Sequence, residues 1–229
     1  MAKTIYDYWF TQFDFPDADG KPYRSSGGKM VWNDTLKCEI PFGWEVRKIK
    51  DICAVTWGQC PEGKHILPLY ADGIDYCSGA GDMKGGFLVD CQAKTDDSQR
   101  SAHKNDILIS VAGKIGDICV VDHDISLGRA AAAFSPTDEE NVMFIFCLLQ
   151  NFNRKLTTIS SGSIQKVINN DHIDELLLAY NEQAIRDFGE IALPIYRKLT
   201  ELSHENRELT KLRDWLLPML MNGQATIAD

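Results

Sequence analysis

The chain has 229 residues, of which 44% are hydrophobic and 25% charged, a composition ordinary for a globular protein. No apolar run is long enough to cross a bilayer, which excludes a helical membrane protein. The net charge of −9 weighs against nonspecific nucleic-acid binding, so any contact with DNA would need a local basic patch or a more basic partner.

Residues 1–45 are predicted to form an aromatic-rich connector. Residues 5–15 are dense in aromatic side chains, and residues 16–22 hold two prolines, two aspartates and a glycine, which favour turns. Residues 25–29 predict a surface loop, because their glycines lack the strand and helix that flank a phosphate-binding loop. We expect the connector to be extended, with its aromatic side chains packed on the domain that follows.

Residues 46–180 are predicted to form one domain with many short strands. A helix is expected to begin near Arg47, and an irregular loop is expected around the glycines of residues 79–86. The apolar runs that predict strands are residues 66–70, 87–89, 107–111, 118–121 and 130–134. Gly113 and Gly116 flank Lys114 between two of these runs, which predicts a hairpin with Lys114 in its turn.

The second half of the domain is predicted to begin with a helix. Residues 141–155 carry apolar side chains at helical spacing, with two cations at the end, where they suit the helix dipole. A hydroxyl-rich loop is predicted at residues 157–163. Asn169 or Asn170 is then expected to cap a short segment, residues 171–177, that leads to the last element.

A long helix is predicted over residues 182–221, inside a spacer region of residues 181–223 that a tail, residues 224–229, follows. Apolar positions recur at alternating steps of three and four, the spacing of a coiled-coil seam. The seam comprises Ile185, Phe188, Ala192, Ile195, Leu199, Leu202, Asn206, Leu209, Arg213 and Leu216. Pro194 is expected to kink or break the helix near Ile191. The seam alone leaves two interpretations equally open: packing on the chain's own domain, or pairing with a helix of another chain.

The predicted fold class is therefore α/β (α+β), a mixed domain of short strands followed by a coiled-coil helix. The seven cysteines form no CxxC pair, and we see no signal peptide, which favours reduced thiols in a cytoplasmic protein. No metal site is predicted: Asp72, Asp75 and Asp82 could form a cluster, but carboxylates in a glycine-rich loop are more often solvated. No catalytic residue is predicted either, because HExxH and GxSxG motifs and a motif for S-adenosylmethionine are all missing.

Several motifs, in a fixed order over nearly the whole chain, resemble the DNA-specificity subunit of type I restriction–modification systems. They read YDYWFTQFDFP, GKPYRSSGGKMVW, IPFGWEVRKIKDI, NDILISVAGKIGDI, SLGRAAAAF, SGSIQKVINNDHI and ENRELTKLRDWLLPMLMNG. Members of that family carry two target recognition domains and two long helices in one chain. This chain has one of each, so it resembles the second half of such a subunit standing alone.

The resemblance implies a non-catalytic subunit in which residues 46–180 are a target recognition domain that reads one half of a split site in double-stranded DNA. A half-subunit would homodimerise through its long helix and read a palindromic, interrupted site. The helix seam implied for this contact is Ile195, Leu199, Leu202, Asn206, Leu209 and Leu216. The helices would also dock the type I methyltransferase subunit, which would bind S-adenosylmethionine, and indirectly the restriction and translocase subunit. This chain itself would hold no cofactor.

Base reading needs directional donors and acceptors on loops, so Arg, Lys, Asn and Gln are the natural candidates. The candidates for DNA contact are Arg100, Lys104, Lys114, Arg129, Ser161, Ser163, Gln165 and Lys166. The loop of residues 160–166 is the strongest, because it offers hydroxyls, an amide and a cation together. Arg129 could instead be structural and pair with Asp117 or Asp122.

Two other functions stay open at this point. The chain could be a decoy that binds host specificity or methyltransferase subunits through its helix without reading DNA, which the acidic balance would suit. It could also be an enzyme, for which the sequence offers no site.

Overall fold

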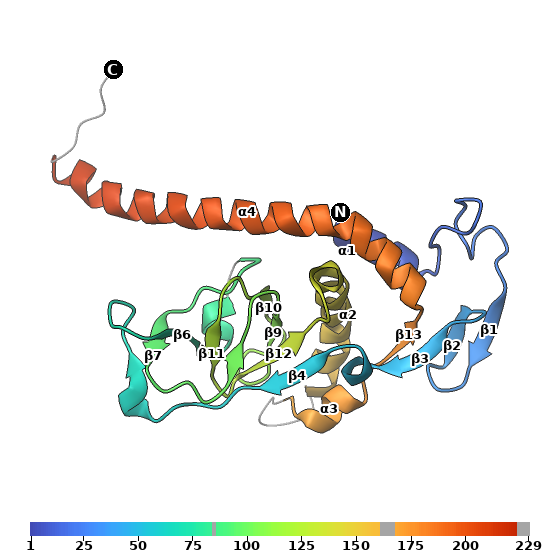
Figure 1. Cartoon of the computed structure of the whole chain (residues 1–229), viewed down its shortest axis with the longest axis horizontal. Helices are drawn as coiled ribbons and strands as arrows, with labels where there is room; N and C mark the ends of the chain where they lie inside the picture. Colours follow the sequence, from blue (N-terminus) through green and yellow to red (C-terminus); the bar gives the residue numbers. More distant parts are fainter. Residues whose placement is uncertain (84–85, 161–167, 224–229) are drawn as a thin grey trace, which may run out of the picture.

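The computed structural model describes residues 1–83, 86–160 and 168–223. A head of short strands and helices carries the long helix α4 (Glu182–Met221) along one side (Figure 1). This mixed α/β architecture with a C-terminal helix confirms the predicted fold class.

The centre of the head is a four-stranded antiparallel sheet with strand order β10-β9-β12-β4. Its strands are β4 (Ala54–Trp57), β9 (Ile107–Ser110), β10 (Ile118–Val120) and β12 (Ala131–Ser135). The predicted β9–β10 hairpin and the alanine-rich strand β12 are confirmed. Side chains alternate across β9: Ile107 and Ile109 join one hydrophobic core, and Leu108 joins another on the opposite face.

A five-stranded sheet with order β5-β7-β6-β11-β8 lies beside the central sheet. Its strands are β5 (Ile66–Leu67), β6 (Ile74–Cys77), β7 (Ala93–Thr95), β8 (Ser101–Ala102) and β11 (Ile125–Leu127), with short 3-10 helices η3 (Gly63–His65) and η4 (Ala80–Met83) in the connections. The strand predicted at residues 66–70 therefore shortens to β5. The strand predicted at residues 87–89 is wrong, because only Leu88 forms a bridge there, to Val120.

The other face of the central sheet is covered by α2 (Val142–Ser160), preceded by the 3-10 turn η5 (Glu139–Asn141). Asp138 caps this start, because its Oδ1 accepts a 3.1 Å hydrogen bond from the Asn141 amide. The predicted helix is confirmed but continues to Ser160. The loop predicted to start at residue 157 therefore starts later, and its remaining positions lie outside the described residues.

After the gap, Asn169 caps α3 (Asn170–Asp174), and β13 (Leu177–Tyr180) pairs antiparallel with β3 (Glu45–Lys48). The helix predicted near Arg47 is wrong: β3 is a strand, and a 3-10 turn, η2 (Ile49–Asp51), follows it. The partner strand explains the difference, since β13 supplies the backbone hydrogen bonds. The Arg47 guanidinium also lies 4.0 Å from the Tyr180 ring centroid, across the pair.

The N-terminal segment is not extended as predicted. It begins with α1 (Ala2–Tyr6) and one π-helical turn, η1 (Asp7–Thr11), and it later forms a hairpin of β1 (Met30–Asn33) and β2 (Cys38–Pro41). Its aromatic side chains do pack on the head as expected. Phe10 lies 4.9 Å from Phe144 of α2, centroid to centroid, and 5.6 Å from Phe188 of α4.

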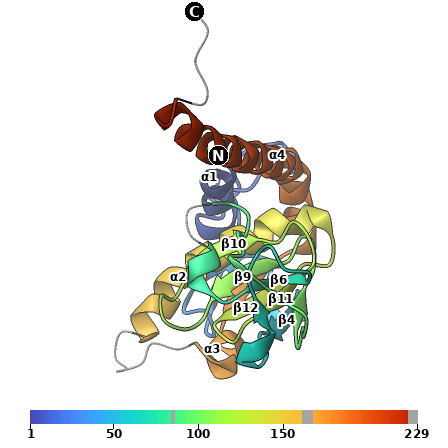
Figure 2. The same cartoon turned by 90° about the vertical axis from the view of Figure 1, so that its left-hand side faces the viewer.

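The sequence predicted a kink or a break near Ile191, and the break does not occur, because α4 runs through Pro194 and Pro218 without ending. Figure 1 shows one change of direction, in the part nearer β13. Asn222 caps the end, and Gly223 follows with φ +65°, as a C-terminal stop requires. The last turns extend past the head in Figure 1, and Figure 2 shows the molecule from that end. Within the described ranges, none of the helices is long and apolar enough to cross a membrane.

Candidate nucleic-acid interface

Four strand ends of the central sheet meet at one edge of the head. The C-terminal ends of β4 and β9 lie there beside the starts of β10 and β12, as the pairings Ala132 to Trp57 and Ala131 to Ser110 show. The loops that leave these ends carry several of the predicted DNA contacts. We call this edge the strand-end surface.

The turn of the β9–β10 hairpin places Lys114 at the strand-end surface. Ser110 Oγ donates a 2.7 Å hydrogen bond to the Lys114 carbonyl and accepts one of 2.9 Å from the Asp117 amide, which fixes the turn. Lys114 Nζ pairs with Asp117 Oδ1 at 2.6 Å, while two thirds of the Lys114 side chain stays exposed. The turn also packs on α2, because Asn153 Nδ2 donates a 2.6 Å bond to the Gly116 carbonyl.

Arg129 reaches the same surface through a close crossing of two backbone segments. A Cβ atom on Gly58 would lie 2.1 Å from the Gly128 carbonyl oxygen, so only glycine fits there. The Gln59 amide bonds the Leu127 carbonyl at 2.9 Å, and the Gly128 amide bonds the Cys77 carbonyl at 2.8 Å. This crossing holds the exposed residue Arg129 at its outer edge.

The acids considered as structural partners of Arg129 pair with other cations. Asp117 pairs with Lys114 and Asp122 with Arg207, so the pairing considered for Arg129 with either acid is not formed. Partial burial raises the pKa of the Cys60 thiol, but hydrogen bonds from Tyr76 and the Arg129 amide, and the positive charge of Arg129, outweigh it and lower the pKa. The guanidinium of Arg129 is thus exposed at the strand-end surface.

The described chain resumes after the late loop near this surface. It leaves α2 after Ser160, and the amide of Ile168, where the described chain resumes, donates a 2.8 Å hydrogen bond to the Val111 carbonyl beside the hairpin turn. The predicted contacts Ser161, Ser163, Gln165 and Lys166 lie outside the described residues.

The two remaining candidates for DNA contact, Arg100 and Lys104, lie at different places on the head. The Arg100 carbonyl accepts a 2.7 Å bond from the Leu127 amide, which places Arg100 next to the crossing that carries Arg129. Lys104 lies at the opposite end of the central sheet, before β9, where its charge helps Arg197 to lower the pKa of Glu139. The backbone therefore brings Arg100, Lys114 and Arg129 to one surface and leaves Lys104 near α4.

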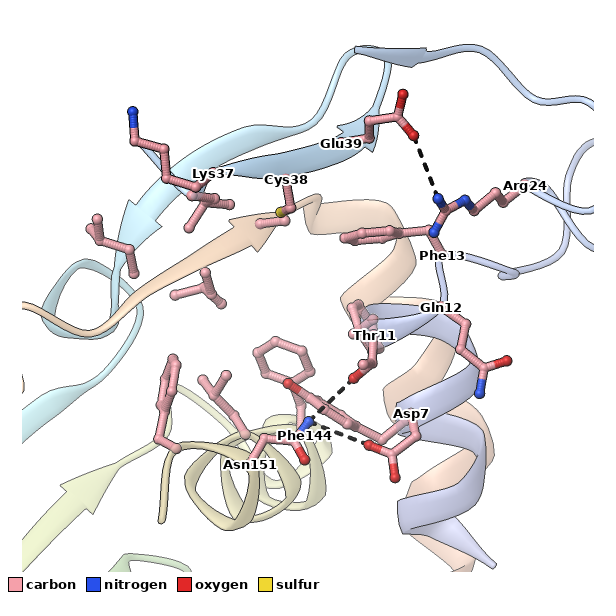
Figure 3. Close-up of a pocket in the computed structure, with 18 of the residues that line it drawn as sticks. Asp7, Thr11, Gln12, Phe13, Arg24, Lys37, Cys38, Glu39, Phe144 and Asn151 are labelled. Carbon is pink, nitrogen blue, oxygen red and sulfur yellow. Dashed lines mark hydrogen bonds and ion pairs between the residues drawn. The ribbon is translucent and has the colours of Figure 1, made fainter. Parts of the chain in front are cut away.

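A groove of about 1110 Å³ lies elsewhere, between the N-terminal segment, α2 and β13 (Figure 3). Phe144 and other apolar side chains line it, and Asn151 bonds Asp7 and Thr11 at 3.3 Å each across one wall. Arg24 pairs with Glu39 at 3.4 Å on another wall. Lys3, a second cation of the lining, pairs with Asp7, so both of these cations have an acidic partner.

The seam of α4 divides into two parts. Ile185, Phe188 and Ala192 are buried against the head, and Ile195 and Leu199 pack partly on it. Beyond them the predicted seam turns outward: Leu202 is 41% exposed and Leu209 56% exposed, Asn206 is exposed, and Leu216 is partly buried.

The last turns of α4 carry exposed apolar side chains that the seam prediction missed. They are Leu212, Trp215, Leu217, Leu220 and Met221. The apolar run near the end of the chain was the available signal, because such a run in a projecting helix is seldom solvated throughout.

Two of the three acidic residues considered for a metal, Asp75 and Asp82, have other partners. Asp75 bonds His123 at 2.9 Å, and Asp82 accepts hydrogen bonds from Ser78 and the Gln92 amide. In the part of the chain that the structure describes, no three His, Cys, Asp or Glu side chains are grouped to hold a metal ion.

Comparison with known proteins agrees with these features. The family model for the type I restriction modification DNA specificity domain matches residues 41–179. The MjaIX specificity subunit of Methanocaldococcus jannaschii is 22% identical over 240 residues, covering 100% of this chain and 53% of that protein. The HindI specificity subunit of Haemophilus influenzae is 23% identical over 198 residues, covering 81% and 42%. The chain thus spans about half the length of these relatives.

Solved structures show the same fold. The HsdS subunit from Thermoanaerobacter tengcongensis superposes with a TM-score of 0.57 at 18% identity, covering 83% of this chain and 47% of that one. A chain from a structure on complex assembly and conformational transition of the type I R-M system gives 0.59 at 20% identity, covering 80% and 46%.

Proposed function

The chain belongs to the type I restriction modification DNA specificity family, whose model matches more than half of its residues, and we propose that it is a non-catalytic half-subunit that homodimerises to read DNA. The head reads one half-site, and a second copy reads the other. Methylation of adenine and cleavage of DNA are carried out by partner subunits in the cytoplasm. S-adenosylmethionine binds to the methyltransferase partner, and this chain holds no cofactor.

The observation that carries this proposal is the divided seam of α4. The helix buries Phe188 and Ala192 completely in its own head, yet it leaves Leu209 and Trp215 more than half exposed beyond it. A stripe of apolar side chains in water is a docking surface that lacks its partner. Because the exposed stripe continues the three-and-four spacing of a coiled-coil seam, a second copy of α4 is the partner we propose.

Two-fold symmetry then sets the DNA site. Two identical heads related by a two-fold axis read the same bases on opposite strands, so the site is a palindrome interrupted by a fixed spacer. The paired helices hold the heads apart and offer a surface for the methyltransferase subunit, and through it for the restriction and translocase subunit.

The strand-end surface is the part of the head proposed to face DNA. Arg129, Arg100 and Lys114 supply donors there, and Ile168, which follows the predicted loop of residues 160–166, bonds Val111 beside the hairpin turn. Lys104 sits at the other end of the sheet, so its proposed role is a phosphate contact and not base reading. The net charge of −9 means that DNA affinity depends on these few cations and on the partner subunits.

The test is to co-express the chain with a methyltransferase subunit and map modified adenines across a genome. Wild-type protein should yield one bipartite palindrome, and Arg129→Ala, Gln165→Ala and Lys166→Ala should each weaken or relax modification of it. Lys21→Ala is the matched control, because this exposed cation lies in the N-terminal turn.

The map of modified adenines also distinguishes the proposed function from the alternative one. Binding of the methyltransferase without any new modified motif would favour a decoy that engages the complex through α4 alone. A motif in one piece, without symmetry, would contradict the dimer.

A further inference from the structure

We propose that Arg207 is a positioning residue that locks the head to α4 and thereby sets the spacer length of the bipartite site. This inference rests on the proposed function and adds the residue that determines its geometry. It starts from an ion pair between two elements 85 residues apart in the sequence.

The guanidinium of Arg207 holds two separate groups of the head. Nη1 lies 3.1 Å from Asp122 Oδ2, and Nη2 donates a 2.8 Å hydrogen bond to the Val89 carbonyl. Val89 is itself fixed, because its amide bonds the Val120 carbonyl at the end of β10. One side chain of α4 thus joins the segment before β7 and the turn after β10.

The carboxylate of Asp122, which accepts the ion pair from Arg207, is buried among several partners. The Asp122 side chain is only 4% exposed, and it also bonds His123 Nδ1 at 2.7 Å and lies 3.6 Å from His204 Nε2. A buried charge without a cation is costly, and Arg207 is the one of these three partners that stays charged at every relevant pH. The helix cannot leave this position without removing that cation.

Arg207 is the second of two anchors on α4. The first lies near Tyr196, whose hydroxyl bonds Asn105, and Arg197, which pairs with Glu139 at 2.8 Å. Eleven residues of helix separate Tyr196 from Arg207, a distance of about 16 Å. The buried half of α4 holds the head around the first anchor, and a second anchor this far along the helix fixes the direction of the exposed half as well.

That direction decides which DNA spacer fits. Adding one base pair moves a half-site by about 3.4 Å and turns it by about 34° around the duplex. Heads fixed on a rigid rod accept one spacing, and heads that pivot accept neighbouring spacings. Farther along the helix, Lys211 pairs with Glu208 and Arg213 with Asp214 of α4 itself, so these cations do not direct the head.

The experiment compares methylation by the complete complex on duplexes that carry the mapped site with its native spacer, or with one base pair more or fewer. The variants are Arg207→Met and Asp122→Asn, and Lys211→Met, which lies off the seam, is the matched control on the exposed part of the same helix. Hydrogen exchange of residues 199–210 in the isolated chain is measured in parallel, because it reports whether α4 is held locally.

We expect wild type and Lys211→Met to prefer the native spacer by about tenfold or more. Arg207→Met should reduce that preference at least about threefold while the half-site sequence stays the same, and residues 199–210 should exchange faster. Asp122→Asn keeps the hydrogen bond from Arg207 to the Val89 carbonyl, so it should reduce the spacer preference less. This variant takes the place of Arg207→Met in the test if Arg207→Met does not fold.

A folded Arg207→Met complex with the wild-type spacer preference would overturn the inference, as would equal losses in Lys211→Met. A wild-type complex that modifies no two-part site would refute the proposed function and with it the link to spacer length. In that case the exchange data still decide whether Arg207 holds the head, so the two failures are distinguishable.

Discussion

The hydroxyl of Tyr196, in the buried half of α4, donates a 2.7 Å hydrogen bond to Oδ1 of Asn105, just before β9. Asn105 adopts φ +76°, a conformation that asparagine tolerates better than most residues. The Tyr196 ring also meets Phe87 edge to face, with centroids 6.0 Å apart, and burial raises the pKa of its hydroxyl. This pair joins the base of the helix to the central sheet.

Removing the Tyr196 hydroxyl should weaken the contact between α4 and the central sheet without leaving a cavity. Tyr196→Phe keeps the ring packing and loses one hydrogen bond, so we expect the free energy of unfolding to fall by about 1 kcal/mol. Urea denaturation measures this. Tyr70→Phe is the control, because Tyr70 is 92% exposed and its loss of a hydroxyl should change nothing. Equal effects of the two substitutions would contradict the role assigned to Asn105.

The two halves of α4 should respond differently to truncation. Phe188 is 0% exposed and contacts the rings of Tyr6, Trp9 and Phe144, so Phe188→Ala should cost about 3–5 kcal/mol of stability. Leu209→Ala should change the unfolding of the head by less than about 0.5 kcal/mol, because the Leu209 side chain is 56% exposed. Unfolding is followed by near-ultraviolet circular dichroism at low protein concentration. A large loss of head stability in Leu209→Ala would show that the outer half packs on the chain's own head.

Stability should depend on pH through His123. Partial burial opposes its protonation, but hydrogen bonds to Asp75 and Asp122 outweigh burial and raise the pKa. Because the folded pKa lies above the unfolded one, the stabilisation is fully present below pH of about 6.5 and is lost as the pH rises through the folded value. The other charged groups that face this cluster are Lys94, His204 and Arg207.

Thermal unfolding between pH 5 and pH 9 measures this dependence. In His123→Gln, stability should fall less steeply as the pH rises above the unfolded pKa. His103→Gln, at an exposed position, should show the same fall in stability as wild type. An unchanged profile in His123→Gln would assign the pH dependence to other groups.

The crossing that presents Arg129 should tolerate no side chain at Gly58. In Gly58→Ala the new Cβ would lie 2.1 Å from the backbone oxygen of Gly128, so a backbone segment must shift. We expect a loss of about 1–3 kcal/mol in stability and weaker DNA binding. Gly63→Ala is the matched control, since nothing lies within 4 Å of its added Cβ. Wild-type stability in Gly58→Ala would mean that the crossing is not as close as described.

Local patterns predicted the elements that local contacts determine. The apolar runs of β9 and β10 around Gly113 and Gly116 indicated a hairpin, and helical spacing indicated α2 and α4. In contrast, β3 depends on β13, which lies about 130 residues later, so the sequence around Arg47 had no signal for its strand partner. The parallel pairing of β6 with β11 is nonlocal in the same way.

The same limit applies to the candidate site. Lys114 could be placed in a turn from its neighbours alone. The convergence of Arg100 and Arg129 depends on backbone bonds to Leu127 and Cys77, and the partner of Asp122 is Arg207 of α4 and not the nearby Arg129. Which half of the seam is buried could not be predicted either, because a heptad stripe looks the same whether its own domain or another chain covers it.

The central claim is that the outer half of α4 joins two copies of this chain, and sedimentation velocity at micromolar concentration, with and without the methyltransferase subunit, tests it most directly. The account predicts a species of twice 25.7 kDa for the chain alone or two copies in the complex, and a folded monomer for Leu209→Asp. A wild-type chain that stays at 25.7 kDa alone and enters the complex as one copy would contradict it.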